Sequence, residues 1–401
     1  MSKPEKKSLL VIFFVIVFII GATVGIIFFA QGYQISTKGK ISFLATGIIS
    51  ATSKPKSASV YVDDKLLATT DNAINLPPGN YNIKIVKDGY LPWQKSIQVK
   101  KEIAYQTNTQ LFRSSPDLKP LTVTGAINPA VSPDGTLVVF AVASASAAKN
   151  NGLYLIGLSD NVVFLIKNEA KQLSSDLQNL DWSKFTFTFS PNSKQILAHN
   201  TTTNSGNYLI DLTTTTDYKN LYDVTAKLSL IKEDWDLQEQ QIIKSNLALL
   251  PVELQPFIST SSAKNALFNI DNTMVLYLAQ IDGNLKKDII TPPPAQSTQT
   301  QSRDILKDHY YIYDLKDDTN FLLGTKDSLY NPSWIANSNN LIYIEDQKIQ
   351  TVEYDSTNRQ TLFAGNFNKN AVYPWLDGSK IITLTAPYSN AQENLYSITI
   401  K

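Results

Sequence analysis

The residues that most often act as general bases are scarce in this chain. It has two histidines, His199 and His309, and neither has a histidine, cysteine or glutamate neighbour at the spacing of a metal site. Histidine is both the commonest general base and the commonest metal ligand, so catalytic or zinc chemistry would be sought first at these two positions. The chain has no cysteine, which excludes cysteine nucleophiles, thiolate metal sites and disulfides. We therefore interpret both histidines as structural residues.

Motifs that carry established chemistry are also missing. The sequence holds no Gly-x-Ser-x-Gly nucleophile elbow, no Gly-x-x-x-x-Gly-Lys phosphate loop and no His-Glu-x-x-His zinc motif. Each of these motifs places a nucleophile, a phosphate cradle or a metal ligand at a fixed position, so a protein of those classes would show it. Hydrolase, nucleotide-binding and zinc-protease functions have no support in the sequence.

Carboxylates are the remaining candidates for chemistry. No Asp-x-Asp-x-Asp-Gly calcium loop occurs, and a glycosidase or lyase pair built from distant carboxylates stays open. We predict no catalytic residue, no cofactor and no metal site. The acidic residues fall at turns of expected hairpins, where a structural role in a solvated turn explains them: Asp134, Asp271 and Asp377, and the pairs Asp63-Asp64, Asp317-Asp318 and Glu345-Asp346.

The turn that contains Asp134 belongs to a repeated pattern of strand, turn and strand. The first copy reads NPAVSPDGTLVVF at 128–140, and the last two copies lie 40 residues apart, from Asn337 to Asp377. Units of three or four strands at a period near 40 are typical of β-propeller blades. The other copies occupy residues 187–198, 267–279, 332–344 and 373–384.

The best preserved turn, Ser132-Pro133-Asp134-Gly135, resembles the TolB-like, WD40-like propeller repeat, with Trp334 and Trp375 supplying its aromatic position. The resemblance implies a β-propeller. Five blades are visible, with a sixth if residues 222–262 contain a degenerate copy. The segment 118–124 is expected to pair with the last strand, 395–400, and to close the ring. One large residue precedes each turn, and we predict that this set packs between neighbouring blades: Val131, Phe189, Phe268, Trp334 and Trp375.

Two insertions interrupt the predicted ring. Residues 233–258 are expected to form a helical insertion, capped by Asp234 or Asp236 and broken at Pro251. Residues 286–308 contain a loop rich in Pro, Gln, Ser and Thr that is expected to be exposed. Insertions of this kind often carry the binding specificity of a scaffold, although a tolerated surface loop explains the second equally well.

The N-terminal region contains one long apolar segment. Residues 9–30 carry no charge, and as a helix they would span about 33 Å, enough for a hydrocarbon core of about 30 Å. A cleaved signal peptide is the alternative, but its apolar region is usually about 7–15 residues long. We predict a cytoplasmic tail at 1–7, a transmembrane helix at 8–30, and the C-terminal bulk outside the cytoplasm.

A small β-rich module follows a polar stalk at residues 31–40. Its strand at 58–62 leads into a hairpin turn at Asp63-Asp64, and Pro77-Pro78-Gly79-Asn80 forms a second strong turn. Together with Lys87-Asp88-Gly89-Tyr90 and Trp93, these residues resemble the PEGA domain, here at residues 41–112. The resemblance implies a non-catalytic β-sandwich.

The charge balance argues against nucleic acid as a ligand, because 36 basic and 35 acidic residues leave a net charge of +1. The predicted fold class is mostly β: an N-terminal transmembrane helix, a PEGA-like β-sandwich and a TolB-like propeller at 113–401. We predict a membrane-anchored extracytoplasmic binding or scaffolding protein of the cell envelope, engaging a protein, peptide or glycan through the propeller and held in the membrane by residues 9–30. The alternative is an envelope hydrolase or lyase with a carboxylate site in the propeller channel.

Overall fold

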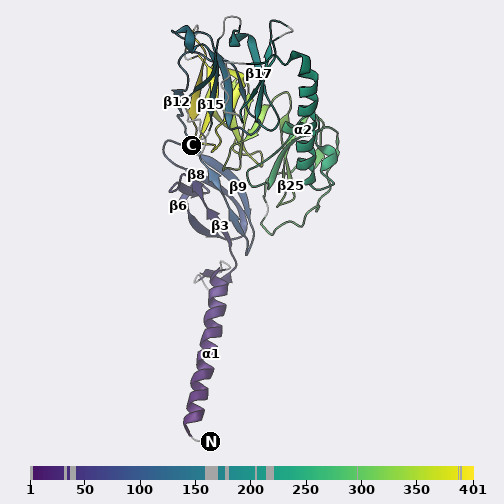
Figure 1. Cartoon of the computed structure of the whole chain (residues 1–401). Coiled ribbons are helices and arrows are strands. Elements are labelled where there is room, and N and C mark those ends of the chain that lie inside the picture. The colour runs from purple at the N-terminus through teal and green to yellow at the C-terminus, as the bar shows by residue number, and fades with distance from the viewer. Residues whose placement is uncertain are drawn as a thin grey trace. The chain divides into compact units, whose positions relative to one another are not determined.

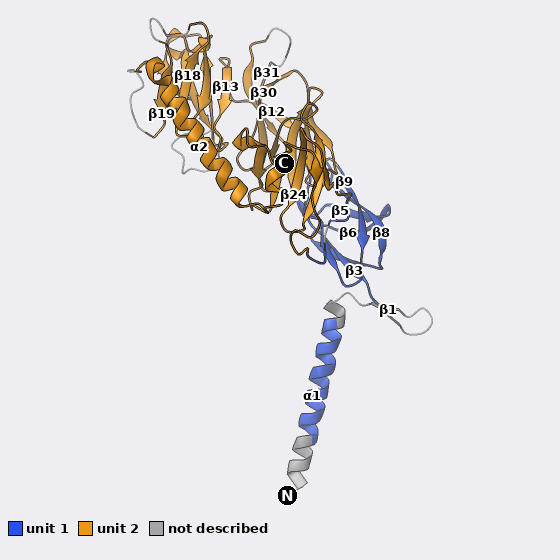
Figure 2. Cartoon of the chain, turned by 90° about the vertical axis from the view of Figure 1, so that its right-hand side faces the viewer, with its two compact units in different colours: residues 1–88, 92–111, 293–299 blue, residues 89–91, 112–292, 300–401 orange. Residues whose placement is uncertain are grey.

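The computed structural model describes the chain except for residues 1–2, 31–33, 37–41, 159–169, 177–179, 204–205, 214–220, 296, 387 and 389–390, and it leaves out the side chains of 3–9, 28–30, 34–36 and 42–44. The predicted mostly-β fold class is confirmed. The chain divides into two compact units (Figure 2). Unit 1 contains residues 1–88, 92–111 and 293–299, and unit 2 contains residues 89–91, 112–292 and 300–401.

Unit 1 begins with helix α1 (Lys3–Ala30). Its stretch Leu10–Ile27 is long and apolar enough to cross a membrane, and none of that stretch is buried by the rest of the chain. A helix of this kind near the N-terminus is found in membrane anchors and in signal sequences alike. Most of the predicted stalk lies outside the described residues, apart from β1 (Gln34–Ser36), which pairs with β2 (Ser42–Leu44).

The rest of unit 1 is built from short strands. One sheet has the order β6-β5-β8-β9, and one face of β5 and β9 is buried while β6 has no buried residue. In β9, Trp93, Ile97 and Val99 are buried while the residues between them are not. The predicted hairpin turn at Asp63-Asp64 has φ angles of 47° and 62°, as a two-residue turn with a right-handed strand twist requires. The strand bounds in this sheet are β5 (Ser59–Val62), β6 (Lys65–Thr69), β8 (Gly79–Val86) and β9 (Trp93–Val99).

The remaining strands of unit 1 form two smaller groups. A three-stranded sheet has the order β10-β3-β7, in which β10 runs parallel to β3, and β11 pairs in parallel with β4. The bounds are β3 (Gly47–Ala51), β4 (Ser53–Lys54), β7 (Asn72–Leu76), β10 (Ala104–Gln106) and β11 (Thr109–Gln110).

Unit 2 contains the propeller. Five antiparallel sheets follow one another among its described residues, and their orders are β13-β14-β15-β16, β17-β18-β19, β20-β21-β24-β25, β26-β27-β28-β29 and β12-β32-β31-β30 (Figure 1). We call them the first to the fifth sheet. The predicted ring closure is present in the fifth sheet, where β12 (Asp117–Pro120) pairs with the C-terminal strand β32 (Asn394–Thr399).

The strands of the first two sheets are β13 (Ile127–Val131), β14 (Leu137–Val142), β15 (Gly152–Gly157), β16 (Lys171–Ser175), β17 (Phe185–Phe189), β18 (Gln195–Asn200) and β19 (Tyr208–Asp211). Those of the third are β20 (Ala266–Phe268), β21 (Met274–Leu278), β24 (His309–Asp314) and β25 (Thr319–Thr325), with a small added pair, β22 (Gly283–Asn284) and β23 (Asp304–Ile305). The last two sheets contain β26 (Tyr330–Trp334), β27 (Asn340–Glu345), β28 (Lys348–Glu353), β29 (Gln360–Ala364), β30 (Phe367–Pro374) and β31 (Lys380–Thr385).

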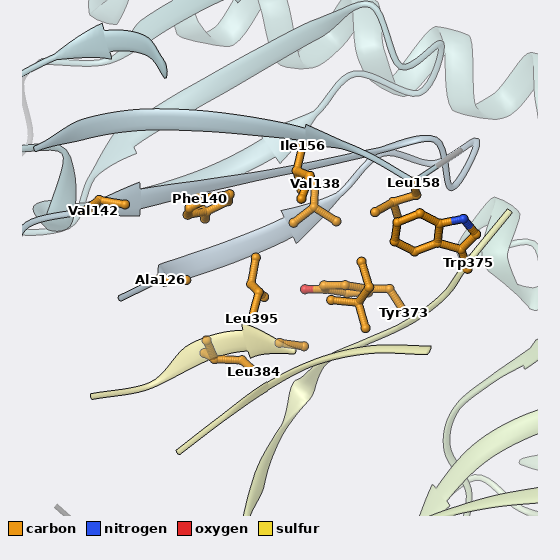
Figure 3. Close-up of a cluster of buried hydrophobic side chains, with 12 residues drawn as sticks. Ala126, Val138, Phe140, Val142, Ile156, Leu158, Tyr373, Trp375, Leu384 and Leu395 are labelled. Carbon is orange, nitrogen blue, oxygen red and sulfur yellow. The ribbon is translucent and has the colours of Figure 1, made fainter. Parts of the chain in front are cut away.

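Four of the five large residues before the repeated turns pack between sheets, as predicted: Val131, Phe189, Trp334 and Trp375. Phe268 differs, because its cluster joins the third sheet to the helical insertion and holds no residue of another of the five sheets. Trp375 of the fifth sheet lies against Leu158 in a buried cluster that joins the fifth sheet to the first (Figure 3). Phe189 of the second sheet packs with Leu155 of the first. The Trp334 indole nitrogen donates a hydrogen bond of 2.8 Å to the Leu267 carbonyl of the third sheet. These positions therefore hold neighbouring sheets together.

Helix α2 (Leu228–Ala248) lies between the second and third sheets (Figure 2). The Trp235 indole nitrogen donates to Gln195 Oε1 of β18 at 3.4 Å, and Asn246 Nδ2 donates to the Ala266 carbonyl of β20 at 3.3 Å. The described residues between 222 and 262 contain this helix and short 3-10 turns, and no sixth sheet. The predicted cap is wrong: the helix begins after Lys227, so Asp234 and Asp236 lie inside it.

Candidate functional site

The innermost strands of the five sheets surround a cavity of about 800 Å³. Each of these strands, β13, β17, β20, β26 and β30, is the last strand at one edge of its sheet, so its free side faces the centre of the ring. Helix α2 completes the wall. The cavity is lined by Pro129, Ala130, Val131, Pro133, Asp134, Phe187, Thr188, Phe189, Pro191, Glu239, Ile242, Asn246, Ser262, Ala263, Lys264, Leu267, Tyr330, Asn331, Asn370 and Tyr373.

Two of the inner strands, β13 and β26, share the same local backbone feature where they border the cavity. Asn128 and Asn331 adopt left-handed φ angles of 50° and 52°, and a proline follows each of them. The pairing register shifts at both places. Asparagine tolerates this backbone region, and proline is accepted in a sheet only at an edge or a bulge because it has no N–H to donate. The Asn-Pro pairs therefore mark the point where each strand turns its free edge to the cavity.

A tyrosine network forms one side of the cavity. The Tyr373 hydroxyl donates to the Pro129 carbonyl at 3.0 Å and to the Asn370 carbonyl at 3.2 Å, which joins the fifth sheet to the first. The Tyr330 hydroxyl of the fourth sheet donates to Asn370 Oδ1. Burial raises the pKa of the Tyr373 hydroxyl, so this group stays a neutral donor at physiological pH. Tyr330 is 43% exposed and is the aromatic side chain of the wall most open to a ligand.

Helix α2 forms another part of the cavity wall and contributes the carboxylate of Glu239, which is held in place by hydrogen bonds. Glu239 Oε1 accepts hydrogen bonds from Ser262 Oγ and from the Ala263 amide, both at 2.9 Å. Ile242 and Asn246, on the following turns of the helix, also line the cavity. The insertion that the sequence predicts between blades therefore borders the cavity directly.

Two of the aspartates at the repeated turns, Asp134 and Asp377, form hydrogen bonds within their own turns. Asp134 Oδ1 accepts from Ser132 Oγ at 2.6 Å and from the Thr136 amide at 3.0 Å. Asp377 Oδ1 accepts from the Ser379 amide at 2.8 Å in the same way. Asp134 also borders the cavity, but its side chain is committed to closing the turn.

The two histidines lie on different sheets and outside the cavity lining. His199 Nδ1 is 2.5 Å from Asn207 Oδ1, and His309 Nδ1 is 2.8 Å from the Lys307 carbonyl. Glu345, at another predicted hairpin, accepts a hydrogen bond of 3.2 Å from Gln350 Nε2. The structure thus brings none of these residues together with the cavity residues.

One buried ion pair was missed by the sequence analysis. Asp318 was interpreted as a solvated hairpin residue, but its side chain is 3% exposed and lies 3.3 Å from the Arg303 guanidinium. The same carboxylate accepts from the Tyr313 hydroxyl and from the Asp288 amide. Arg303 ends the Pro-rich insertion, so this pair fixes the base of that loop to the third sheet. The sequence signal was a lone arginine beside a polar loop.

The tip of the same loop belongs to unit 1. Gln299 Nε2 donates to the Ser96 carbonyl at 2.7 Å, and the Gln98 amide lies 3.4 Å from Thr298 Oγ1. The sequence analysis placed the whole loop in the propeller as an exposed segment, whereas residues 293–299 cluster with unit 1 and lie against the edge of β9.

The β-rich module agrees with a known domain family. Its two-residue turn at Asp63-Asp64, the turn before Tyr81 and the buried Trp93 stand in the order that the sequence indicates. Residues 46–115 match the PEGA domain. The match starts and ends slightly later than the predicted limits of 41–112. No curated protein matches the chain.

Solved structures of several kinds of protein match parts of this chain at low identity. TolB from Acinetobacter baumannii is 11% identical with a TM-score of 0.23; the match covers 80% of this chain and 60% of TolB. The PQQ domain of pyranose dehydrogenase from Coprinopsis cinerea is 10% identical with a TM-score of 0.27, covering 72% and 96%. Oligogalacturonate lyase from Vibrio parahaemolyticus is 7% identical with a TM-score of 0.21, covering 82% and 81%. At these identities and TM-scores, the ligands of those proteins do not indicate the ligand of this chain.

The tyrosine network makes a testable contribution to stability. Tyr373→Phe keeps the ring but removes the hydroxyl that bonds the first and fifth sheets, and we expect it to lower the free energy of unfolding by about 1–2 kcal/mol. Chemical unfolding of the full chain in detergent, followed by tryptophan fluorescence, measures the change. Tyr388→Phe, at a side chain that is 72% exposed, is the control and should have no effect. Equal stability of the two variants would contradict the assigned hydrogen bonds.

Proposed function

We propose that this protein is a membrane-anchored binding or scaffolding protein of the cell envelope. Helix α1 would cross the membrane with the N-terminus in the cytoplasm, and both the PEGA domain and the propeller would lie outside. The uncharged stretch Leu10–Ile27 and the PEGA domain behind it support association with the envelope. The propeller cavity would take a segment of a protein, a peptide or a glycan.

The observation that carries this proposal is the composition of the cavity wall. A volume of about 800 Å³ lies in the range of ligand sites, which are mostly apolar with a few converging polar groups. Here proline, phenylalanine and tyrosine side chains alternate with the amides of Asn331 and Asn370. Tyr330 combines an exposed ring with a hydroxyl already held in place, and rigid aromatic side chains of this kind dominate binding energies.

The alternative, an envelope hydrolase or lyase, needs two free carboxylates facing one another. The two carboxylates in the described lining are Asp134 and Glu239, and each already accepts hydrogen bonds from its own neighbourhood. This arrangement favours binding over catalysis. That the protein is not an enzyme remains a prediction.

A photo-crosslinking experiment tests the proposed site. A benzophenone amino acid is placed at position 330 of the full chain in intact cells, and the cells are irradiated with ultraviolet light. For a protein or peptide ligand we expect one crosslinked adduct. For a glycan ligand we expect the protein to be retained on isolated cell-wall material. Tyr222→benzophenone, at a side chain that is 80% exposed and outside the cavity lining, is the matched control.

A second variant links any adduct to the cavity. Asn370→Ala, in the protein without benzophenone, removes the partner of the Tyr330 hydroxyl. Its affinity for the molecule identified by crosslinking should fall roughly tenfold, as the loss of a binding contact of about 1.4 kcal/mol implies. If position 330 gives no adduct beyond that of position 222, and no cell-wall fraction retains the protein, the binding proposal is wrong.

A further inference from the structure

The two edges of the sheet β6-β5-β8-β9 differ in whether another segment of the chain covers them. At one edge, residues 298 and 299 bond to the backbone of β9 through the Gln98 amide and the Ser96 carbonyl. At the other edge is β6, and no described strand pairs with its outer side. An uncovered edge strand is a template for pairing with another chain, and natural proteins usually cover or charge such edges.

Strand β6 is also unusual in the side chains that it shows. Leu66 is 60% exposed and Leu67 is 52% exposed. Consecutive residues of a regular strand point to opposite faces, but the register between β5 and β6 shifts at this point, so that Leu67 is an extra residue opposite β5. The bulge leaves two neighbouring leucines open to solvent at the free edge.

We propose that β6 pairs with β6 of a second copy of this chain, forming a two-fold symmetric dimer that continues the sheet. Antiparallel pairing centred on Leu67 sets Leu67 against Leu67, Leu66 against Ala68 and Lys65 against Thr69. The leucines are covered and no like charges oppose each other within the strand. Beyond the strand this register sets Asp63 of one copy against Asp71 of the other, and Lys56, at 3.3 Å from Asp71, compensates the second acidic charge. The edge is therefore self-complementary, as an isologous interface requires.

Helix α1 gives independent support for an identical partner. Gly21 and Gly25 lie four residues apart on one helix face, and apart from neighbouring residues and the backbone of the helix itself, nothing lies within 4 Å of where a β-carbon would stand on either. In a membrane, two small residues at this spacing let a second helix approach closely. The inference therefore rests on the membrane anchoring proposed above. Helix and sheet edge belong to the same unit and both present a surface suited to a second copy.

The size of the contact predicts where the dimer forms. Stable soluble complexes bury about 1,200–2,000 Å², far more than pairing of the five residues Lys65–Thr69 provides. Confinement of two anchored chains to one membrane raises their effective concentration and compensates for a small interface. The dimer is expected in membranes and is expected to dissociate in dilute detergent.

Because the chain has no cysteine, a single introduced cysteine reports on this contact alone. Leu67→Cys is placed in the full chain in native membranes and treated with a mild oxidant. Directly opposite residues in antiparallel strands have Cα atoms about 4.5–5.5 Å apart, within the span of a disulfide. We expect a reducible band at twice the chain mass, roughly tenfold stronger than that of Leu237→Cys, a leucine on α2 that is 60% exposed, against 52% for Leu67.

A second variant tests the contribution of the helix. Gly21→Leu with Gly25→Leu, added to Leu67→Cys, should reduce the dimer band several-fold, whereas Ile16→Leu, on the opposite face of the helix, should leave it unchanged. Membrane sedimentation is measured in the same samples. A Leu67→Cys protein that sediments with membranes but dimerises no more than Leu237→Cys overturns the dimer and leaves the anchor intact. Crosslinking to a species of another mass also overturns it, and a protein that does not sediment overturns anchor and dimer together.

Discussion

Arg303→Met is expected to lower the free energy of unfolding of the propeller by about 3–5 kcal/mol, because it leaves a buried carboxylate without its cation. The Asp318 side chain is 3% exposed and the Arg303 side chain 10% exposed, so water cannot replace the lost partner. Methionine keeps most of the volume of the arginine stem, which separates the charge effect from a packing effect. Chemical unfolding of the full chain in detergent measures the change.

Two companion variants make the result specific. Lys326→Met removes an exposed cation from the turn that follows β25 of the third sheet, and it should change stability by less than about 0.5 kcal/mol. Asp318→Asn in the Arg303→Met background removes the unpaired charge while keeping an acceptor for the Tyr313 hydroxyl, and it should restore part of the loss. If Arg303→Met is no less stable than Lys326→Met, the pair does not hold the loop.

This pair could not be predicted from the sequence because its two members belong to segments of different kinds. Asp317-Asp318 occupies a hairpin, where a solvated turn is the ordinary interpretation, and Arg303 follows a Pro-rich loop. The sequence contains three arginines, Arg113, Arg303 and Arg359. Each donates to a backbone carbonyl of another segment, at Lys401, Asp318 and Leu323. The planar arginine fork can bind a carbonyl and a carboxylate together, as Arg303 does. The Arg113 side chain is 40% exposed, so an arginine in this lysine-rich chain marks a bond to another segment and not burial.

The fold was predictable because its information is local and repeated. A strand, a Ser-Pro-Asp-Gly type turn and a second strand recur, and the large residue before four of the five turns packs between sheets as its recurrence indicates. The ring closure followed from the incomplete last repeat. The predicted helix start was wrong: Asp234 and Asp236 have side chains that can cap a helix, but the helix begins at Leu228, directly after the 3-10 turn Thr225–Lys227.

The cavity could not be read from the sequence. Its wall joins Pro129, Glu239, Tyr330 and Asn370, which come from three sheets and a helix and share no motif. Only the three-dimensional ring brings them together, and their residue types are common at structural positions. In the conspicuous Ser-Pro-Asp-Gly turn, in contrast, the Asp134 side chain forms hydrogen bonds within the turn itself.

The second large effect is expected where the ring closes. Ile398→Ala should cost about 2–5 kcal/mol, because Ile398 is 0% exposed and its truncation leaves a cavity in the cluster between the fourth and fifth sheets. Its cross-strand partner Leu118 is 39% exposed, so Leu118→Ala should cost roughly 1 kcal/mol or less. Both variants are compared by chemical unfolding of the full chain.

Removal of the closing strand carries the same argument to its limit. A chain that stops before Asn394 loses Leu395, Ile398 and Ile400, each at most 1% exposed, and frees both β12 and β31 of their common partner. Burial of three such side chains contributes about 1.5–3 kcal/mol each, which is comparable to the whole stability of about 5–15 kcal/mol of a folded domain. The truncated propeller should therefore lose cooperative unfolding and resistance to trypsin. If it keeps both, the sheets form a stable open array, and pairing of β12 with β32 is a consequence of the ring and not its support.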